Sequence, residues 1–290
     1  MKNQKGNEGI TSALYIWNGL TAFWGTSFHT DPHFHNTLQL VFDIDKEFKL
    51  KDESSEWSNY SSAIIKTAHV HQLDSNQSIQ LFLYLDQDSE YAQRLSDKYL
   101  KERNICSLKD SDIGKMSTHF FKKLLVDTDC DNLFQGFLKI IEHLIDFELP
   151  QKKDERISKA IKLIEESKGI LKVKDIAAHV FLSESRLRFL FKREVGQSIQ
   201  SFMLWMKVIH SVNPILKGKQ LGQTAHDVGF WDASHMNRSY KELLGIAPSA
   251  MKKYEKELKV IACEKSNFYT FRTEILADWR ADKPYRTVDI

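Results

Sequence analysis

The sequence predicts an α+β protein, with a small N-terminal β-barrel, a helical hairpin and an all-α C-terminal domain. Three observations lead to this fold class. A short pattern occurs twice between residues 173 and 254. Runs rich in β-branched and aromatic residues, separated by turn signals, occupy residues 1–105. Between residues 88 and 146, apolar residues recur at the three- and four-residue spacing of helices.

The repeated pattern has the features of a helix-turn-helix motif. The first copy reads DIAAHVFLSESRLRFLFKREVG at 175–196, and the second reads TAHDVGFWDASHMNRSYKELLG at 224–245. Each copy has an alanine, Ala177 or Ala225, three residues before a valine, then a turn with one apolar residue and a second helical run. A small residue lets two helices approach closely, and the apolar turn residue fills their junction. The second helix is then left exposed to enter a groove of DNA.

Cap residues and the connecting segment support this interpretation. Ser183 and Asp232 are predicted N-caps of the second helices, and Gly196 and Gly245 are predicted to end them. The segment 198–217 has a helical period, and about 20 helical residues span about 30 Å, close to the ~34 Å of one DNA turn. The repeat therefore predicts two DNA readers one turn apart. An α-hairpin repeat that packs and binds nothing would use similar small residues, and it is the weaker alternative.

Residues 157–254 resemble the DNA-binding domain of AraC/XylS-type transcription regulators. The residues that carry the resemblance most strongly are Val228-Gly229-Phe230, Ser234, Arg238, Tyr240-Lys241, Gly245 and Pro248. Thr224 stands where the family usually has isoleucine, and Pro214 interrupts the connecting helix, where it is expected to kink the helix. The resemblance implies a sequence-specific regulator whose partners are double-stranded DNA and RNA polymerase.

The candidate DNA contacts lie on the exposed side of each second helix. Arg188 could pair with guanine and Phe189 could press against a thymine methyl group, whereas lysines farther along suit phosphates. The first set is Ser185, Arg186, Arg188, Phe189 and Lys192; the second is Ala233, Ser234, His235, Asn237, Arg238 and Lys241.

The N-terminal half resembles the cupin-like sensor of many AraC-type regulators, through Pro32-His33-Phe34-His35 to Gln39 and through His69-Val70-His71. Histidines two apart on a strand share a face, so four imidazoles could converge on a metal ion. Metal-binding cupins have a glutamate where this chain has Gln39, and we therefore expect no metal and no cofactor. Any small-molecule effector would bind inside the barrel, lined by Trp24, His35, Gln39 and His69.

The predicted domains are a cupin-like barrel at 1–105, a helical pair at 106–149, a DNA-binding domain at 150–254 and an extension at 255–290. Helices are expected at Glu90–Arg103, Asp112–Val126 and Asp131–Ile145. The helical pair could form a homodimer interface or simply cover the barrel. The extension is too aromatic for a solvated tail and is expected to pack on one of the domains.

Acidic residues predominate in the N-terminal part of the chain and basic residues in the part that follows. Residues 1–154 hold 17 Lys and Arg against 23 Asp and Glu, and residues 155–254 hold 17 against 9, a net charge of +8. A basic module beside an acidic one is typical of a DNA-binding domain attached to a regulatory domain. No run approaches 18 apolar residues and no signal sequence is evident, so we expect a cytoplasmic protein that enters no membrane. The scattered Cys106, Cys130 and Cys263 are expected to be reduced, without an intramolecular disulfide.

Two other functions remain as alternatives. The first is a cupin-type metal-dependent enzyme with a helical accessory domain, and the second is non-specific DNA packaging. The chain has no G-x-S-x-G, no phosphate-binding glycine loop and no cysteine beside a plausible base, so we expect no enzymatic activity.

Overall fold

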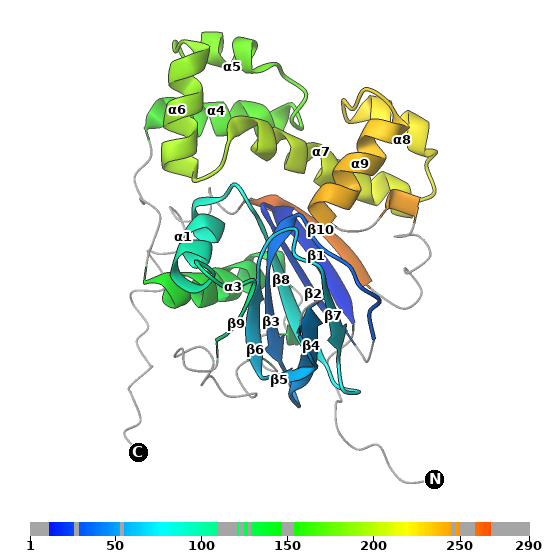
Figure 1. Cartoon of the computed structure of the whole chain (residues 1–290). Coiled ribbons are helices and arrows are strands. Elements are labelled where there is room, and N and C mark those ends of the chain that lie inside the picture. Colours follow the sequence, from blue (N-terminus) through cyan, green and yellow to red (C-terminus); the bar gives the residue numbers. More distant parts are fainter. Residues whose placement is uncertain are drawn as a thin grey trace.

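The computed structural model describes residues 12–25, 29–52, 55–108, 121, 125–126, 129–146, 154–244, 247–249 and 259–267. A sheet-rich part carries a helical part on one end (Figure 1). The mixed α+β class predicted from the sequence is confirmed at this level.

Two β-sheets make up the sheet-rich part. The larger sheet has the strand order β10-β1-β2-β8-β3-β6-β9 and the smaller has the order β5-β4-β7. The pairing of β1 with β10 is parallel, and the other pairings of the named strands are antiparallel. The strands of the larger sheet are β1 (Ala13–Asn18), β2 (Leu20–Gly25), β3 (Thr37–Asp43), β6 (Ser62–Ile65), β8 (Gln80–Asp86), β9 (Ile105–Ser107) and β10 (Lys259–Asn267). Those of the smaller are β4 (Phe48–Asp52), β5 (Ser58–Tyr60) and β7 (His71–Asp74).

The described strands form two open sheets, so the structure does not show the small β-barrel predicted for residues 1–105. The strands β4 and β7 do not extend the larger sheet but pack against its face. Phe48, Leu50 and Leu73 of the smaller sheet share a buried cluster with side chains of β3, β6 and β8. Face-to-face packing therefore buries the apolar face of these strands without closure of a barrel.

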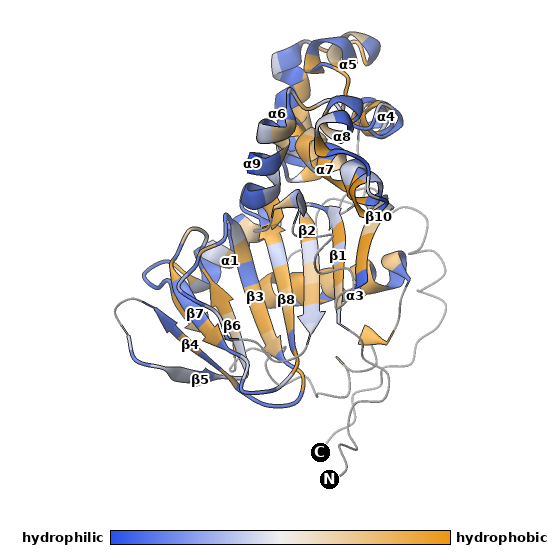
Figure 2. Cartoon of the chain, turned by 90° about the vertical axis from the view of Figure 1, so that its right-hand side faces the viewer, coloured by the Kyte–Doolittle hydropathy of each residue, from blue (hydrophilic) through white to orange (hydrophobic). Residues whose placement is uncertain are grey.

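The larger sheet is covered on both faces. One face packs against α1 (Glu90–Tyr99) and α3 (Cys130–Ile145), where Trp17 contacts Phe134 and Phe137. Alternate residues point to the other face, so Leu14 and Ile16 of β1 meet α7 (Ile199–Leu216) instead. Figure 2 shows α7 lying across the β1–β10 edge, with apolar residues along both.

The helices α1 and α3 correspond to two of the three helices predicted between residues 88 and 146. The helices α1 and α3 pack together, and Tyr91 donates a hydrogen bond to Glu142 at 2.7 Å. The predicted helix Asp112–Val126 lies almost entirely outside the described residues. The apolar side chains of α3, from Leu133 to Leu144, are buried in the core beneath the sheet.

The expectation of reduced cysteines is wrong for two of the three. Cys130 and Cys263 form a disulfide, with an S–S distance of 2.02 Å and Cα atoms 5.8 Å apart. The partners are 133 residues apart in the sequence, and β10 brings them together by pairing with β1 beside α3. No local spacing could indicate this pairing, because it depends on where a distant strand adds to the sheet. Cys106 has a free thiol and is half-buried.

The helical part consists of α4 (Glu155–Glu166), α5 (Val173–His179), α6 (Glu184–Val195), α7, α8 (Leu221–Asp227) and α9 (Ala233–Leu244). The predicted caps are confirmed where they are described. Ser183 accepts from the Arg186 amide, Asp232 accepts from the His235 amide, and Gly196 ends α6 with φ +75°. Gly245 lies outside the described residues. Among the described helices, none is both long and apolar enough to cross a membrane.

Pro214 lies within the last turn of α7, which continues to Leu216. A proline lacks the backbone N–H that would donate to the carbonyl four residues earlier, but α7 continues for two residues beyond Pro214. The helix that connects the two motifs is therefore unbroken from Ile199 to Leu216.

Candidate nucleic-acid interface

The two helix-turn-helix motifs begin their turns with the same backbone geometry. Ala177 and Ala225 are buried, as their role in close helix packing requires. Five residues after each alanine, a backbone amide donates back to its carbonyl: Leu182 to Ala177 at 3.0 Å and Phe230 to Ala225 at 2.8 Å. The repeated sequence pattern therefore corresponds to a repeated backbone structure.

Each turn contains one residue in the left-handed region. It is Phe181 in the first motif, with φ +56°, and Gly229 in the second, with φ +78°. The next residue is the apolar one that fills the helix junction. Phe230 is buried there, whereas Leu182 is half-buried.

The predicted contacts on α6 form an exposed basic and aromatic surface. Ser185, Arg186, Phe189 and Lys192 are exposed, with 56% of Phe189 accessible to solvent. Arg188 is half-buried and lies 3.5 Å from Glu184. The guanidinium groups of Arg186 and Arg193 lie 5.4 and 5.7 Å from the centre of the Phe189 ring. These cation–π contacts hold the ring and both charges on one side of α6.

The predicted contacts on α9 differ in their exposure to solvent. Ser234, Arg238 and Lys241 are exposed, whereas Ala233, His235 and Asn237 are half-buried. The His235 ring packs edge-on against Phe230 at 5.2 Å, so it supports the helix junction as well as reaching the surface. Trp231, in the turn before α9, is 92% exposed and was not among the predicted contacts. The repeated pattern did not indicate Trp231, because the second turn is one residue longer than the first and Trp231 has no counterpart there.

The connecting helix α7 anchors the second motif with polar contacts. Lys207 donates to the Gly229 carbonyl at 2.8 Å, and the hydroxyls of Ser211 and Tyr240 are hydrogen-bonded at 2.6 Å. Burial raises the pKa of Tyr240, so its hydroxyl stays protonated. Thr224 is buried where isoleucine was expected, and its hydroxyl donates to the Gln220 carbonyl within α8 at 3.0 Å. This bond satisfies the hydroxyl, so the departure at Thr224 leaves the motif intact.

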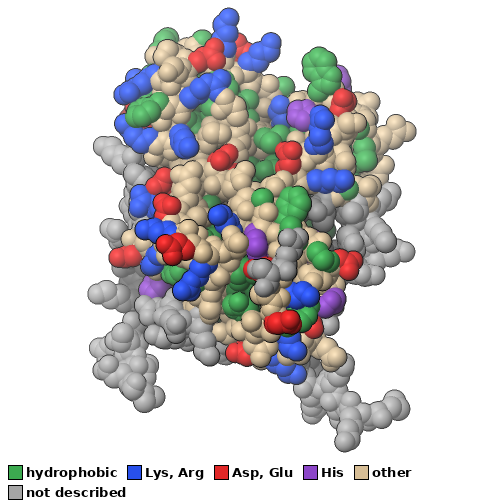
Figure 3. Space-filling model, in the orientation of Figure 1, with side chains coloured by type: hydrophobic (Ala, Val, Ile, Leu, Met, Phe, Trp, Pro, Cys, Tyr) green, Lys and Arg blue, Asp and Glu red, His purple; other side chains and the backbone are tan. Residues whose placement is uncertain are grey.

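Figures 1 and 2 together place α6 and α9 on the same face of the helical part, on either side of α7. Lys and Arg side chains gather over α5 and α6 on this face (Figure 3). The arrangement presents two exposed helices and a positive surface to one side, as binding to a polyanion requires.

A buried carboxylate joins the helical part to the sheet. Asp86, at the end of β8, accepts hydrogen bonds at one oxygen from Gln197, Ser201 and Trp205, at 2.5, 2.5 and 2.8 Å. Asn18 also donates to the Phe202 carbonyl of α7, at 3.1 Å. Together with the apolar contact of α7 on β1, these bonds fix the connecting helix to the sheet.

The four residues predicted to line an effector pocket do not gather in one place on the sheets. Gln39 lies opposite Tyr84 on the sheet, and His35 contacts Tyr84 with ring centres 4.9 Å apart. Trp24 points to the other face of the sheet, where it stacks on Tyr15. His69 lies 3.5 Å from Asp52. The histidines that accompany His35 are instead His33 and His71, so the predicted convergence of four imidazoles is wrong for His69.

Comparisons with known proteins concern mainly the C-terminal part. Residues 176–254 match a family model described as a helix-turn-helix domain. The uncharacterized HTH-type transcriptional regulator YidL of Escherichia coli (strain K12) is 32% identical over 82 residues, which is 28% of each chain. The chain thus matches less than a third of the length of this curated relative.

Two solved structures are also similar. ToxT from Vibrio cholerae O395 has 14% identity and a TM-score of 0.39, with 85% of this chain and 98% of that chain covered. A transcriptional regulator with an AraC-type DNA-binding domain from Chromobacterium violaceum has 22% identity and a TM-score of 0.32, with 34% and 91% covered.

Proposed function

We propose that this chain, whose residues 176–254 match a helix-turn-helix domain, is a sequence-specific DNA-binding transcription regulator of the AraC type. The helices α6 and α9 enter two adjacent major-groove segments, and α7 sets the distance between them. The exposed side chains at the start of each helix read bases, and the lysines farther along contact phosphates.

One observation carries this proposal most directly. Both motifs repeat the same backbone hydrogen bond across the turn, from Leu182 to Ala177 and from Phe230 to Ala225, and both recognition helices flank a single connecting helix. A protein with one functional reader would need neither the second turn nor the contacts that fix it to α7.

We further propose that the sheet-rich part regulates DNA binding. Asp86 and the apolar contact between β1 and α7 support this, because any change in the sheet would act on the helix that holds both readers. Such a regulator would act in the cytoplasm, contact RNA polymerase, and respond to a small-molecule effector or to homodimer formation. Assembly of two copies would be tested by sedimentation of the full chain at several concentrations.

Arg238→Ala is expected to remove the preference at one or two base pairs and to weaken binding to the preferred site by about 1–3 kcal/mol. The exposed Arg238 lies on the outer side of α9 and forms no ion pair with the described residues. Binding would be measured by fluorescence anisotropy with the preferred duplex and with single-base variants.

The control variant is Lys162→Ala, which also removes one exposed positive charge but lies on α4, outside both recognition helices. It should change affinity slightly and equally for all duplexes. If Arg238→Ala behaves like Lys162→Ala, Arg238 does not read a base.

A further inference from the structure

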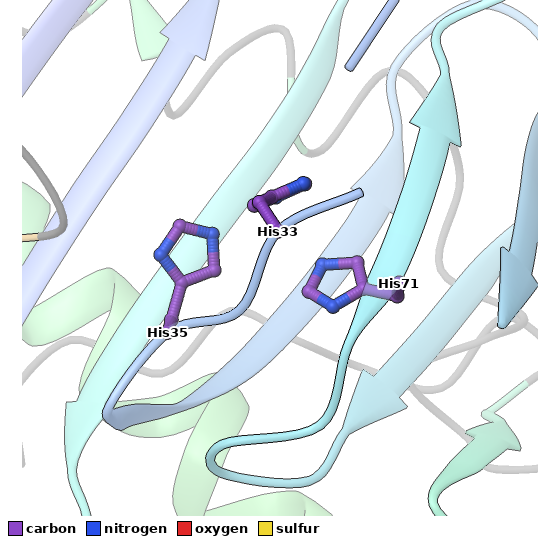
Figure 4. A group of neighbouring side chains, drawn as sticks. All are labelled: His33, His35 and His71. Carbon is purple, nitrogen blue, oxygen red and sulfur yellow. The ribbon is translucent and has the colours of Figure 1, made fainter. Parts of the chain in front are cut away.

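Three histidines meet beside the smaller sheet, although they come from two separate segments. His33 and His71 are directly opposite each other in an isolated β-bridge, with reciprocal backbone hydrogen bonds of 3.0 and 2.9 Å. His35 follows two residues after His33, on the same side. The ring centres lie 4.4 Å apart for His33 and His71, 4.9 Å for His33 and His35, and 5.9 Å for His35 and His71. Figure 4 shows the three rings around a common space.

Backbone carbonyls fix the tautomer of two of these rings. Nδ1 of His33 lies 2.9 Å from the Asp31 carbonyl, and Nδ1 of His71 lies 2.9 Å from the His69 carbonyl. A carbonyl can only accept, so each Nδ1 carries the proton and each Nε2 keeps a free lone pair. In metal-binding histidines, a hydrogen bond from the ring nitrogen that does not bind the metal orients the ring in the same way.

The Nε2 atom of His71 is buried and has no hydrogen-bond partner among the described residues. A buried acceptor without a partner is unfavourable, so a ligand bound at this atom would be stabilising. The side chains around it supply none within the part of the chain that the structure describes.

Burial disfavours the charged form of two of the three rings, those of His35 and His71. Burial, and then the neighbouring His33 and His71, lower the pKa of His35 to about 3. Burial is also the main cause that lowers the pKa of His71, to about 4.

We propose that His33, His35 and His71 form a binding site for one divalent late transition-metal ion of the Zn²⁺ type. One nitrogen from each ring can be chosen so that the three lie within 4.8 Å of one another. Nitrogens bound to one tetrahedral zinc are about 3.4 Å apart, because Zn–N bonds are about 2.0–2.1 Å. Small side-chain rotations close that difference, and imidazole is a preferred ligand of Zn²⁺, Ni²⁺ and Cu²⁺.

Three protein ligands leave one coordination position for water or another small ligand. We expected no metal from the sequence because Gln39 occupies the position at which metal-binding cupins have a glutamate ligand. In the structure the third imidazole is supplied instead by His71, from the neighbouring chain segment. The site therefore needs no carboxylate, and it does not depend on the proposed DNA-binding function.

The test uses the full chain, stripped of metal with EDTA and then titrated with Zn²⁺ in competition with a chromophoric chelator. We expect one ion bound per chain and an increase in thermal stability that saturates with Zn²⁺. With Co²⁺ in place of Zn²⁺, visible absorption bands typical of tetrahedral nitrogen coordination should appear. Absence of both the bands and one-to-one binding in the wild-type chain would overturn the proposal.

Single histidine substitutions would show which residues bind the metal ion. His71→Gln and His35→Gln should each raise the Kd for Zn²⁺ by more than about 100-fold, since loss of a group that only orients a metal ligand already costs about 10–100-fold. The matched controls are His69→Gln, in the same segment but next to Asp52, and His29→Gln, an exposed histidine beside Asp74. Both should keep affinity within a few fold. Equal losses in all four variants, or none in any, would contradict the assignment, and circular dichroism of each variant would establish that it folds.

Discussion

Asp86→Ala is expected to lower the free energy of unfolding by about 3–5 kcal/mol, because it leaves three donors without their acceptor in a buried junction. One carboxylate oxygen serves Gln197, Ser201 and Trp205, and the side chains of Gln197 and Trp205 are fully buried. No other described side chain accepts from the Trp205 indole. The loss would be measured by urea unfolding, and Trp205 fluorescence should shift to longer wavelength as water enters the junction.

The control for this prediction is Asp88→Ala, two residues beyond Asp86, which ends β8. The Asp88 carboxylate is exposed, so its removal should change stability by less than about 0.5 kcal/mol. If Asp86→Ala and Asp88→Ala are equally stable, the carboxylate does not hold the connecting helix to the sheet. The proposed route of regulation would then lose its main support.

Gly169→Ala is expected to destabilise the helical part by about 2–4 kcal/mol. Gly169 has φ +75°, a conformation that costs an L-residue about 1–2 kcal/mol. A Cβ atom there would lie 2.5 Å from the Met203 carbonyl oxygen of α7, which is backbone and cannot move aside without shifting the helix. The strain and the overlap therefore add, and thermal and urea unfolding would measure the sum.

Alanine substitutions at two other glycines serve as comparisons for Gly169→Ala. At Gly229, φ is +78° and a Cβ would meet the flexible Ile170 side chain at 3.0 Å, so alanine should cost less than at Gly169. At Gly222, in α8, a Cβ would meet nothing within 4 Å, and alanine should leave stability unchanged or slightly raised. A different order of stability among the three variants would contradict the described packing of α4 and α7.

The features predicted correctly from the sequence are those encoded locally. The alanine, the turn residue and the cap of each motif lie within about ten residues of one another, so their spacing alone determines the backbone geometry. The N-caps Ser183 and Asp232 are confirmed for the same reason.

The features missed depend on long-range packing. The pairing of β10 with β1, and with it the Cys130–Cys263 disulfide, joins segments whose separation in sequence gives no signal. The open sheets follow from β4 and β7 packing on a face, which strand periodicity cannot distinguish from barrel closure. Alternation placed His33 beside His35 correctly, but only the tertiary structure shows that His71 joins them while His69 lies next to Asp52.

The most direct test of the central claim is selection of random duplex DNA by the full-length protein, repeated at low and at physiological salt. Two readers fixed on one connecting helix should enrich two short motifs with centres about 10 base pairs apart, and the preference should persist at physiological salt. Binding that shows no sequence enrichment and vanishes as salt rises would contradict a sequence-specific regulator. Enrichment of a single motif would contradict the bipartite use of α6 and α9.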